Sequence, residues 1–373
     1  MYFDNAATSW PKPQTVMRNV NQALQKAGNP GRGSHQAALW SADIIFQARE
    51  EIADLFGMKN PLQIGFTKNA TEALNFAIAQ IDGPIITTAM EHNSVLRPLF
   101  ARDEQPIIIS ADKNGDLDLG FFLWQIEKKK PSAVIMTHAS NVTGTLYNVA
   151  KIGKACRRQN VTFIVDASQT AGAVPIDFNE ICADMLCFTG HKGLLGPQGT
   201  GGIVVREELA TMLRPCLKGG SGSDSFSQMH PSMMPDVVEA GTGNTHGIAG
   251  LLAGIRFVKA YGVERIFQKE RELADLFRAR IEKIPDIQLY GNFNEPHVGI
   301  VSFNLPNMDS AECCAKLSRQ HVAVRGGSHC APLAHDALGT RETGAVRFSF
   351  GVMNTKKEVE QATGILYNIS IQG

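Results

Sequence analysis

Residues 188–199 read Phe188-Thr189-Gly190-His191-Lys192-Gly193-Leu194-Leu195-Gly196-Pro197-Gln198-Gly199. A single lysine, Lys192, lies here among glycines, behind a threonine and a histidine and after an apolar run. Glycines let the backbone approach a bulky ligand closely, and a partly desolvated lysine has a lowered pKa and acts as a nucleophile. The stretch is typical of an amine that bonds to a carbonyl, although on its own it also fits a lysine in a glycine-rich turn.

Apolar strand-like runs alternate with helical patterns around this stretch, from about residue 40 to residue 260. The expected strands are residues 63–67, 85–87, 107–109, 133–137, 163–165 and 185–188, and residues 41–56 show the spacing of a helix. Because these strands are apolar without alternation, both faces of their sheet must be covered. The pattern predicts an α/β fold with a mostly parallel, doubly wound sheet.

The pattern changes from about residue 247 onward. One long helical stretch with a break at Gly262 is followed by expected strands at residues 298–303, 322–325 and 346–350 and expected helices at 311–320 and 356–367. This order predicts a smaller α+β domain at the C-terminal end. Between the two regions, residues 218–235 are rich in Gly, Ser and Met, and we expect them to form a mobile segment.

Composition excludes several classes of protein. The 373 residues carry 36 basic and 36 acidic side chains, and this zero net charge argues against a nucleic-acid partner. The chain has no long apolar run and no signal-peptide pattern at its start, so we expect no membrane span. The seven cysteines are odd in number and lack Cys-x-x-Cys spacing, which argues against disulfides or a metal site and favours a cytoplasmic location.

Polar side chains follow four of the expected strands. Asp166, Asn141, His92 and Lys192 each come shortly after a strand of the predicted sheet. Ligands of doubly wound sheets bind beyond the carboxyl ends of the strands, where these four side chains would meet. Any one of them could be a helix cap or a structural group, but four together predict a shared site.

Lysine with aspartate is the pair that a pyridoxal phosphate enzyme requires. Lys192 would hold the cofactor aldehyde as a Schiff base. Asp166 would keep the pyridine nitrogen protonated, so that the ring accepts electrons from a substrate carbanion. The pair therefore predicts pyridoxal 5'-phosphate as the cofactor.

Other polar residues suit the remaining parts of that cofactor. Residues 69–71 lie at an expected helix start, whose backbone N–H groups bind anions such as phosphate. The imidazole of His92 can stack on the ring, and the amides of Asn141 and Gln169 can form hydrogen bonds with its edge. These residue types support the prediction of the cofactor independently of Lys192.

Several motifs occur in order along the chain. They are residues 4–8 (DNAAT), 67–75 (TKNATEALN), 91–92 (EH), 140–141 with Gly144, 166–169 (DASQ), 189–192 (TGHK), 239–242 (EAGT), 325–330 (RGGSHC) and Arg347. Together they resemble the class V aminotransferase family of pyridoxal phosphate-dependent enzymes, and more narrowly its cysteine desulfurase and selenocysteine lyase branch. The resemblance covers nearly the whole length and implies the fold type I of pyridoxal phosphate-dependent transferases.

The resemblance also implies a role for each matching residue. Lys192 would be the Schiff-base lysine, and Asp166 would pair with the pyridine nitrogen. Gln169 would contact the ring hydroxyl, Asn141 would lie near the same edge or near the substrate, and His92 would stack on the ring. The phosphate would be held by Ala70, Thr71, Thr189 and His191.

Further matching residues would lie at the margins of the site. In the family, the segment that corresponds to Gly241 and Thr242 reaches the phosphate of the neighbouring subunit, which implies a homodimer with shared sites. Arg347 would bind the substrate carboxylate through a bidentate ion pair. The substrate entrance would lie near Arg32 and His35.

The family fold divides into a large cofactor domain and a small domain that combines the C-terminal part with the N-terminal arm. For this chain the division implies a large domain at residues 15–250. The small domain would consist of residues 1–14 and 251–373. The change of pattern near residue 250 agrees with this boundary.

A loop cysteine indicates the class of reaction. In desulfurases such a cysteine attacks the substrate sulfur, and here Cys330 lies in residues 326–332 (GGSHCAP), where His329 and Arg325 favour a reactive thiolate. The resemblance implies conversion of L-cysteine to L-alanine with the sulfur held on Cys330 as a persulfide, and selenocysteine would fit the same chemistry. The short stretch from Cys330 to Arg347 implies that a sulfur-acceptor protein comes to the thiol.

Other functions stay open at this point. A class V aminotransferase, or another pyridoxal phosphate-dependent lyase acting on a different small amino acid, would share Lys192 and Asp166, so only Cys330 favours sulfur chemistry. A regulatory protein on this scaffold could lose Lys192 or Arg347, and both are present. The cysteine loop reads GGSHC where many relatives carry TGHHC, and the chain is some tens of residues shorter, which leaves the substrate open.

Overall fold

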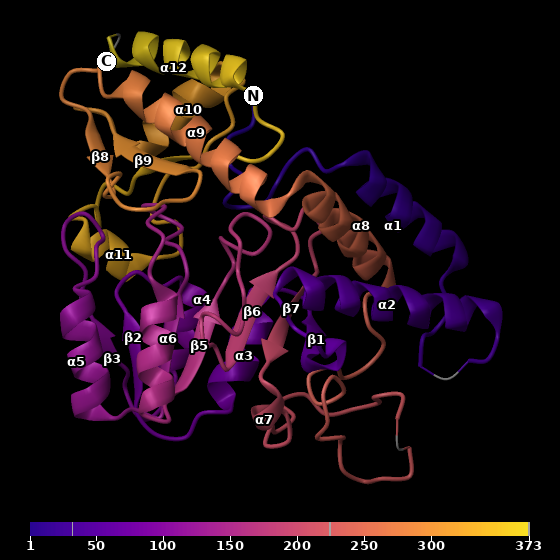
Figure 1. The fold of residues 1–373 in the computed structure, drawn as a ribbon. Helices are drawn as coiled ribbons and strands as arrows, with labels where there is room; N and C mark the ends of the chain where they lie inside the picture. The colour runs from indigo at the N-terminus through magenta and orange to yellow at the C-terminus, as the bar shows by residue number, and fades with distance from the viewer. Residues whose placement is uncertain (32, 224, 372–373) are drawn as a thin grey trace.

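The computed structural model describes residues 1–31, 33–223 and 225–371 (Figure 1). The described helices are α1 (Gln14–Lys26), α2 (Gln36–Leu55), α3 (Ala70–Ala79), α4 (Asn93–Phe100), α5 (Leu119–Lys129), α6 (Val149–Arg158), α7 (Glu207–Ala210), α8 (Thr245–Tyr261), α9 (Val263–Ile281), α10 (Ser310–Arg319), α11 (Pro332–Ala337) and α12 (Lys356–Ser370). The described strands are β1 (Ile64–Thr67), β2 (Ile85–Thr88), β3 (Ile107–Ile109), β4 (Ala133–Thr137), β5 (Thr162–Asp166), β6 (Met185–Thr189), β7 (Gly201–Val205), β8 (Gln288–Tyr290), β9 (Ile300–Asn304) and β10 (Val346–Ser349).

The larger sheet has the order β1-β7-β6-β5-β4-β2-β3. Strands β3, β2, β4, β5 and β6 run parallel, whereas β7 is antiparallel to both of its neighbours. The six strands expected from the sequence are all present, and the mostly parallel sheet is confirmed. The sequence analysis missed β7, because its glycines are typical of a loop and not of a strand.

Both faces of this sheet are covered, as the apolar strands require. Alternate residues of the strands, such as Val134 and Phe163, pack with α2, α5 and α6 in one buried cluster. The intervening residues, such as Ile135 and Ile164, pack with α3 and α4 in a second cluster. The sheet therefore lies in the middle of a three-layer structure, and the carboxyl ends of its parallel strands meet at one edge.

The smaller sheet, β10-β9-β8, is antiparallel and packs with α9, α10 and α12. Its core contains stacked phenylalanines, with the ring centroids of Phe277 and Phe348 4.3 Å apart. Phe3 of the N-terminal arm joins the same cluster, which places the two ends of the chain together. The arm forms single bridges to Ala323 and Ser349, so that the first residues extend the edge of this layer.

The expected strand at residues 322–325 is wrong. The structure has only isolated bridges there, from Ala323 to Tyr2 and from Arg325 to Arg347. The segment lies between the N-terminal arm and β10, and it forms one bridge to each of them. The sequence pattern could not reveal a partner more than 300 residues away.

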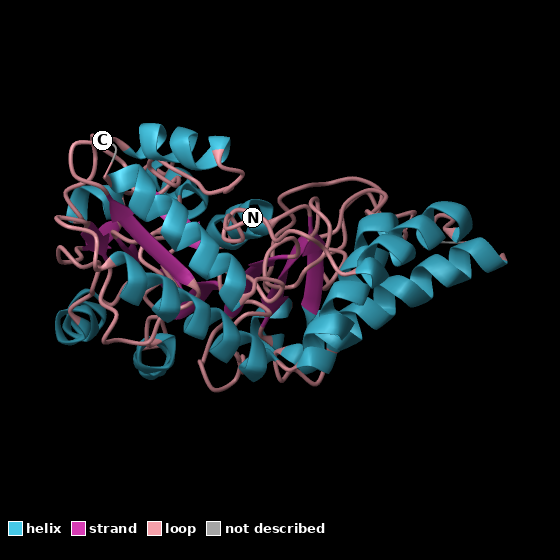
Figure 2. Ribbon diagram, turned by 90° about the horizontal axis from the view of Figure 1, so that it is seen from above, coloured by secondary structure: helices cyan, strands magenta, loops and turns pink. Residues whose placement is uncertain are grey.

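Helices α1, α2 and α8 extend together to one side of the molecule (Figure 2). The expected break in the long C-terminal helical stretch is confirmed, because Gly262 has a φ of 92° and separates α8 from α9. Among the described residues, no helix or strand lies between α7 and α8, and no helix of that part of the chain is long and apolar enough to cross a membrane.

The start of α3 rests directly on the sheet at Gly201. A Cβ added at Gly201 would lie 2.7 Å from the Cα atom of Asn69, the residue that caps α3. Asn69 accepts a hydrogen bond from the N–H of Glu72 with its side chain, which fixes the first turn. The absence of a side chain at Gly201 therefore sets where the helix begins.

We predict that Gly201→Ala lowers the free energy of unfolding by about 1–3 kcal/mol, because the new methyl group forces the backbone at Asn69 to move. Urea unfolding followed by circular dichroism measures the change. Gly364→Ala on α12 is the matched control: a Cβ there meets nothing within 4 Å, and alanine should stabilise the helix by about 1 kcal/mol. Equal unfolding midpoints for the two variants would contradict the prediction.

Candidate functional site

Two neighbouring strands bring Asp166 and Lys192 to one edge of the large sheet. Asp166 is the last residue of β5, lies beside Cys187 of β6 and is 3% exposed. Its carboxylate accepts hydrogen bonds from the backbone N–H and the hydroxyl of Ser168. Lys192 follows three residues after the end of β6. The carboxylate is thus held in place while the amine lies on the adjacent loop.

Lys192 carries an amine of altered basicity. Burial lowers its pKa from 10.5 to about 8, and the positive charges of Arg347 and Arg325 act in the same direction. The carboxylates of Asp166 and Asp4 oppose the shift. Near neutral pH the amine is still mostly protonated, but its unprotonated fraction, which a nucleophile or a base requires, is far larger than that of an ordinary lysine.

The N-terminal arm fixes the peptide that carries this lysine. The backbone N–H of Ser9 and the ammonium of Lys12 donate to the carbonyl of His191, at 3.1 and 2.7 Å. The hydroxyl of Ser9 donates to the carbonyl of Lys192 at 2.9 Å. The imidazole Nδ1 of His191 lies 3.1 Å from the hydroxyl of Thr8. Residues 8–12, which are far from Lys192 in the sequence, thus fix the loop that carries the lysine.

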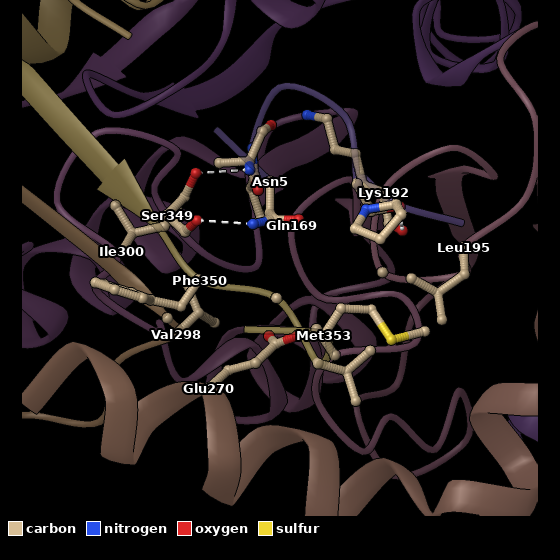
Figure 3. A pocket seen from close by; sticks show the side chains of 18 residues that line it. Asn5, Gln169, Lys192, Leu195, Glu270, Val298, Ile300, Ser349, Phe350 and Met353 are labelled. Atoms are coloured by element: carbon tan, nitrogen blue, oxygen red, sulfur yellow. Dashed lines mark hydrogen bonds between the residues drawn. The ribbon is translucent and has the colours of Figure 1, made fainter. Parts of the chain in front are cut away.

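A small cavity of about 40 Å³ lies between this loop and the smaller sheet (Figure 3). Lys192 and Gln169 line one side, and Glu270 and Met353 line the other. Burial raises the pKa of Glu270 to about 8, although a hydrogen bond from the backbone of Val352 opposes the shift. Near neutral pH this carboxyl is therefore largely protonated, which suits its place in the seam between the two layers.

His92 lies at the start of α4, and its ring Nδ1 caps the helix by accepting from the N–H of Ser94 at 3.0 Å. The hydroxyl of Ser94 lies 2.9 Å from the same nitrogen and 2.7 Å from the hydroxyl of Thr71 on α3. Burial lowers the pKa of His92 to about 4, so that the imidazole is neutral. A neutral ring next to Asp166 and Lys192 can stack on an aromatic ligand.

The residue before His92 is a buried acid. Glu91 is 0% exposed and accepts hydrogen bonds from the hydroxyl of Thr88 and the backbone N–H of Thr137. Burial raises the pKa of Glu91 to about 8. It connects the ends of β2 and β4 and lies near enough to Asp166 for the two charges to interact.

Arg347 is buried on the other side of the site, with 2% of its surface exposed. One guanidinium nitrogen donates to the carbonyl of Asn141 at 2.8 Å, and the other lies 3.1 Å from the carboxylate of Asp4. Within the described part of the chain, its Nε has no hydrogen-bond partner. A buried guanidinium with an unused donor is suited to a carboxylate ligand.

Cys330 is held in a tight turn against these residues. The N–H of Ala331 donates to the carbonyl of Ser328, and both residues between them have positive φ angles, 47° at His329 and 57° at Cys330. Such angles are strained for side chains other than glycine. Asn93 donates its N–H to the carbonyl of Cys330 at 2.7 Å. The side-chain amide of Asn141 donates to the carbonyl of His329 at 2.8 Å.

Most residues predicted from the sequence thus lie close together, and a few do not. Gln169 lines the small cavity together with Lys192, but its amide nitrogen donates to the carbonyl of Ala6 in the N-terminal arm at 3.2 Å. Gly241, Thr242 and His35 are exposed and line a separate groove of about 1580 Å³. The remaining prediction, Arg32, lies outside the described residues.

Sequence reasoning missed several residues that hold the site together. Ser94 connects His92 to Thr71, Ser168 fixes Asp166, and Asp4 pairs with Arg347. The serines lie two residues after the groups they support, which is a common local capping distance. The partner of Arg347 is 343 positions away, so no local pattern could indicate this pair.

The side chains present fit pyridoxal phosphate. Thr189 is 3% exposed, and its hydroxyl finds no hydrogen-bond partner among the described residues, which is unusual for a buried polar group. The first turn of α3, with Thr71, offers backbone N–H groups to an anion. Together with neutral His92, buried Asp166 and the Lys192 amine, these groups match the phosphate, ring and aldehyde of that cofactor.

We predict that Lys192→Met makes the protein more stable at pH 7. Because the pKa of Lys192 is lower in the folded state than in the unfolded chain, the unfolded chain holds the extra proton between about pH 8 and pH 10.5. The cost of burying the amine is therefore full below pH 8 and disappears as the pH rises to 10.5. The advantage of Lys192→Met in urea unfolding should shrink over the same interval. Lys154→Met, at an exposed lysine, is the control, and parallel pH profiles of Lys192→Met and the wild type would contradict this prediction.

The comparisons with known proteins agree on one family. The aminotransferase class-V family model matches residues 1–362. A probable cysteine desulfurase of Pyrococcus abyssi is 32% identical over 381 residues, which cover 98% of this chain and 93% of the relative. Another, from Methanothermobacter thermautotrophicus, is 31% identical and covers 100% and 95% of the two chains.

Solved structures are similar over the same length. The apo structure of a cysteine desulfurase from Thermococcus onnurineus NA1 is 33% identical, with a TM-score of 0.94 and coverage of 100% of this chain and 95% of that one. The cysteine desulfurase CsdA of Escherichia coli, at 24% identity and a TM-score of 0.87, shares the fold. The predicted α/β architecture of fold type I is thereby confirmed. The chain belongs to the aminotransferase class-V family, a family of pyridoxal phosphate-dependent enzymes.

Proposed function

We propose that this protein binds pyridoxal 5'-phosphate and acts as a cysteine desulfurase, which releases L-alanine from L-cysteine and receives the sulfur on Cys330. The observation that carries the proposal is the position of the cysteine turn. The backbone of Cys330 is hydrogen-bonded to Asn93, the neighbour of His92, and the backbone of His329 to Asn141. A thiol on this turn lies against the groups that fit the cofactor, as attack on a bound substrate requires.

The site residues have defined tasks in this proposal. Pyridoxal phosphate, when bound, supplies an electron sink for the carbanion formed by removing a proton from the Cα of an amino acid. Asp166 would pair with the pyridine nitrogen, while Thr71, Thr189 and the start of α3 would hold the phosphate. Ala70 and His191 would contribute to the phosphate site, and Gln169 would lie at the ring edge.

Lys192 and Arg347 act on the substrate. Arg347 binds the substrate carboxylate, and its ion pair with Asp4 fixes the guanidinium in place. The amine of Lys192, with its pKa lowered to about 8, takes the Cα proton and later returns one.

Cys330 accepts the sulfur. Its thiolate attacks the sulfur atom of the substrate, an S–S bond forms and the C–S bond breaks. The electron pair left on carbon takes a proton, and L-alanine leaves. The thiol and L-cysteine together become a persulfide and L-alanine, so that no external oxidant or reductant is needed. Selenocysteine fits the same sequence of steps.

The geometry of the cysteine turn supports delivery of sulfur to a separate acceptor protein. Hydrogen bonds from Asn93, Asn141 and Ala331 hold the backbone of residues 328–330. Moving the thiol outward would break all three, whereas an acceptor can approach a thiol that is only partly buried. A reduced thiol is required throughout, which agrees with the cytoplasmic location expected from the sequence.

The proposal includes a homodimer. Gly241 and Thr242 are exposed and line the large groove, away from the small cavity behind Lys192 of the same chain. In the proposed dimer this turn reaches the phosphate of the neighbouring subunit, with Arg32 and His35 near the substrate entrance. The domain division at residues 15–250 and at 1–14 with 251–373 then places the cofactor mainly in the larger domain.

We predict that Cys330→Ser lowers alanine release from L-cysteine at least about 100-fold and leaves binding of pyridoxal phosphate unchanged. Amino-acid analysis measures alanine, visible absorbance measures the cofactor, and mass spectrometry of the wild type should reveal one added sulfur atom on Cys330. Cys216→Ser, at an exposed thiol, is the control. Full alanine release by Cys330→Ser would refute the assignment of Cys330, and keto-acid formation from cysteine by the wild type would favour an aminotransferase or another pyridoxal phosphate-dependent lyase.

A further inference from the structure

A polar junction outside the predicted site joins β1 to the segment at residues 238–242. Glu239 accepts a hydrogen bond from the backbone N–H of Phe66 with one carboxylate oxygen, at 2.7 Å. Its other oxygen lies 2.7 Å from a guanidinium nitrogen of Arg49 on α2. Strand β1 is at the edge of the large sheet, so this N–H has no neighbouring strand on its outer side. The carboxylate of Glu239 supplies the hydrogen-bond acceptor that a neighbouring strand would otherwise provide.

Arg49 is the third member of this junction and contacts both Glu239 and β1. It is 5% exposed, and its second guanidinium nitrogen donates to the carbonyl of Ile64 at 2.5 Å. The guanidinium carbon also lies 4.7 Å from the ring centroid of Phe66, within the range of a cation–π contact. The buried charge of Arg49 therefore depends on Glu239 as its counter-ion.

The segment that carries Glu239 packs closely on the strand. A Cβ added at Gly65 would lie 2.8 Å from the Cβ of Val238, so only glycine permits this approach. Residues 238–239 are therefore closely packed against β1. The ion pair and the close packing act at neighbouring positions of the same strand.

Each end of the junction leads to a part of the proposed cofactor site. Strand β1 ends at Thr67, and α3 begins at Ala70, so Phe66 lies four residues before the predicted phosphate site. Glu239 lies two residues before Gly241, whose N–H donates to the carbonyl of Gly220 at 2.7 Å. Thr67 and Thr242 also line the same groove.

We propose that Glu239, together with Arg49, is a positioning residue that fixes the phosphate-binding start of α3 and the turn at residues 241–242 relative to each other. The inference rests on the proposed function, in which the turn serves the neighbouring subunit. One ion pair then supports two cofactor sites, the site of its own chain through β1 and the site of the partner through the turn.

The first test measures the affinity for pyridoxal phosphate by visible absorbance. Glu239→Gln retains an acceptor for the N–H of Phe66 but removes the counter-ion of Arg49, and we expect the dissociation constant to rise about tenfold. Arg49→Lys replaces the planar guanidinium by a single ammonium group, and we expect a similar rise in the dissociation constant. Glu360→Gln is the matched control, because its partner Arg280 forms a surface ion pair of 2.8 Å, and we expect less than a twofold change.

The second test separates positioning from general stability. Thermal unfolding of each variant without cofactor shows whether the substitution merely weakens the fold. A lower melting temperature with an unchanged dissociation constant would overturn the inference. If Glu239→Gln fails to fold, Glu239→Asp keeps the charge on a shorter side chain and should still weaken the cofactor, and unchanged affinity in that variant would likewise overturn it.

Mixed dimers test the connection between subunits. One chain carries Lys192→Ala and the other keeps Lys192, so that borohydride traps the cofactor at one site only. Glu239→Gln is then placed either in the chain with Lys192 or in its partner. We expect about a tenfold higher cofactor requirement for trapping in both arrangements, and a change in one arrangement alone, or in neither, would overturn the inference.

The same experiments distinguish failure of the inference from failure of the proposed function. Wild-type protein that takes up no pyridoxal phosphate would refute the proposed function itself. Wild-type protein that binds the cofactor as tightly as Glu239→Gln does would refute only the role of Glu239. Wild-type protein that binds the cofactor but sediments as a monomer would refute the proposed homodimer, and with it the support of two sites by one ion pair.

Discussion

The balance of charge around the Lys192 amine is the constraint on which the rest of the site depends. Two guanidiniums, Arg347 and Arg325, and burial favour the neutral amine, while Asp166 and Asp4 favour the charged one. Two of these groups also have a second task, since Asp4 fixes Arg347 and Arg347 holds the backbone of Asn141. Moving any one of them would change both the basicity of the amine and the shape of the site.

This balance requires contacts between segments that are distant in the sequence. The N-terminal arm holds the lysine loop through Ser9 and Lys12 and supplies Asp4 to the site. Its Phe3 is buried in the core of the smaller sheet. The arm thus connects the core of the smaller sheet to the loop that carries Lys192. A movement of the smaller sheet relative to the larger one would therefore also move this loop.

How much of this could be predicted from the sequence depended on the range of the interaction. Local patterns located six strands of the large sheet, the start of α3 and the polar groups at strand ends, because those signals lie within a few residues. The role of Gly201 and Gly202 in β7 was hidden, since glycines that admit Asn69 and the ring of Phe188 have the composition of a loop. The pairs Asp4–Arg347 and Arg49–Glu239 could not be found from spacing, because nothing local specifies a partner almost 200 or more residues away.

The cysteine turn shows why a strained conformation is maintained next to the site. His329 and Cys330 both have left-handed backbone angles that non-glycine residues avoid, and this costs free energy that the surroundings must offset. Hydrogen bonds from Asn93 and Asn141 to the two carbonyls supply that compensation. These asparagines adjoin His92 and Arg347, so the residues that shape the ligand site also determine the direction of the thiol. A ligand that orders Asn141 would therefore also order Cys330, which connects substrate binding with the position of the attacking sulfur.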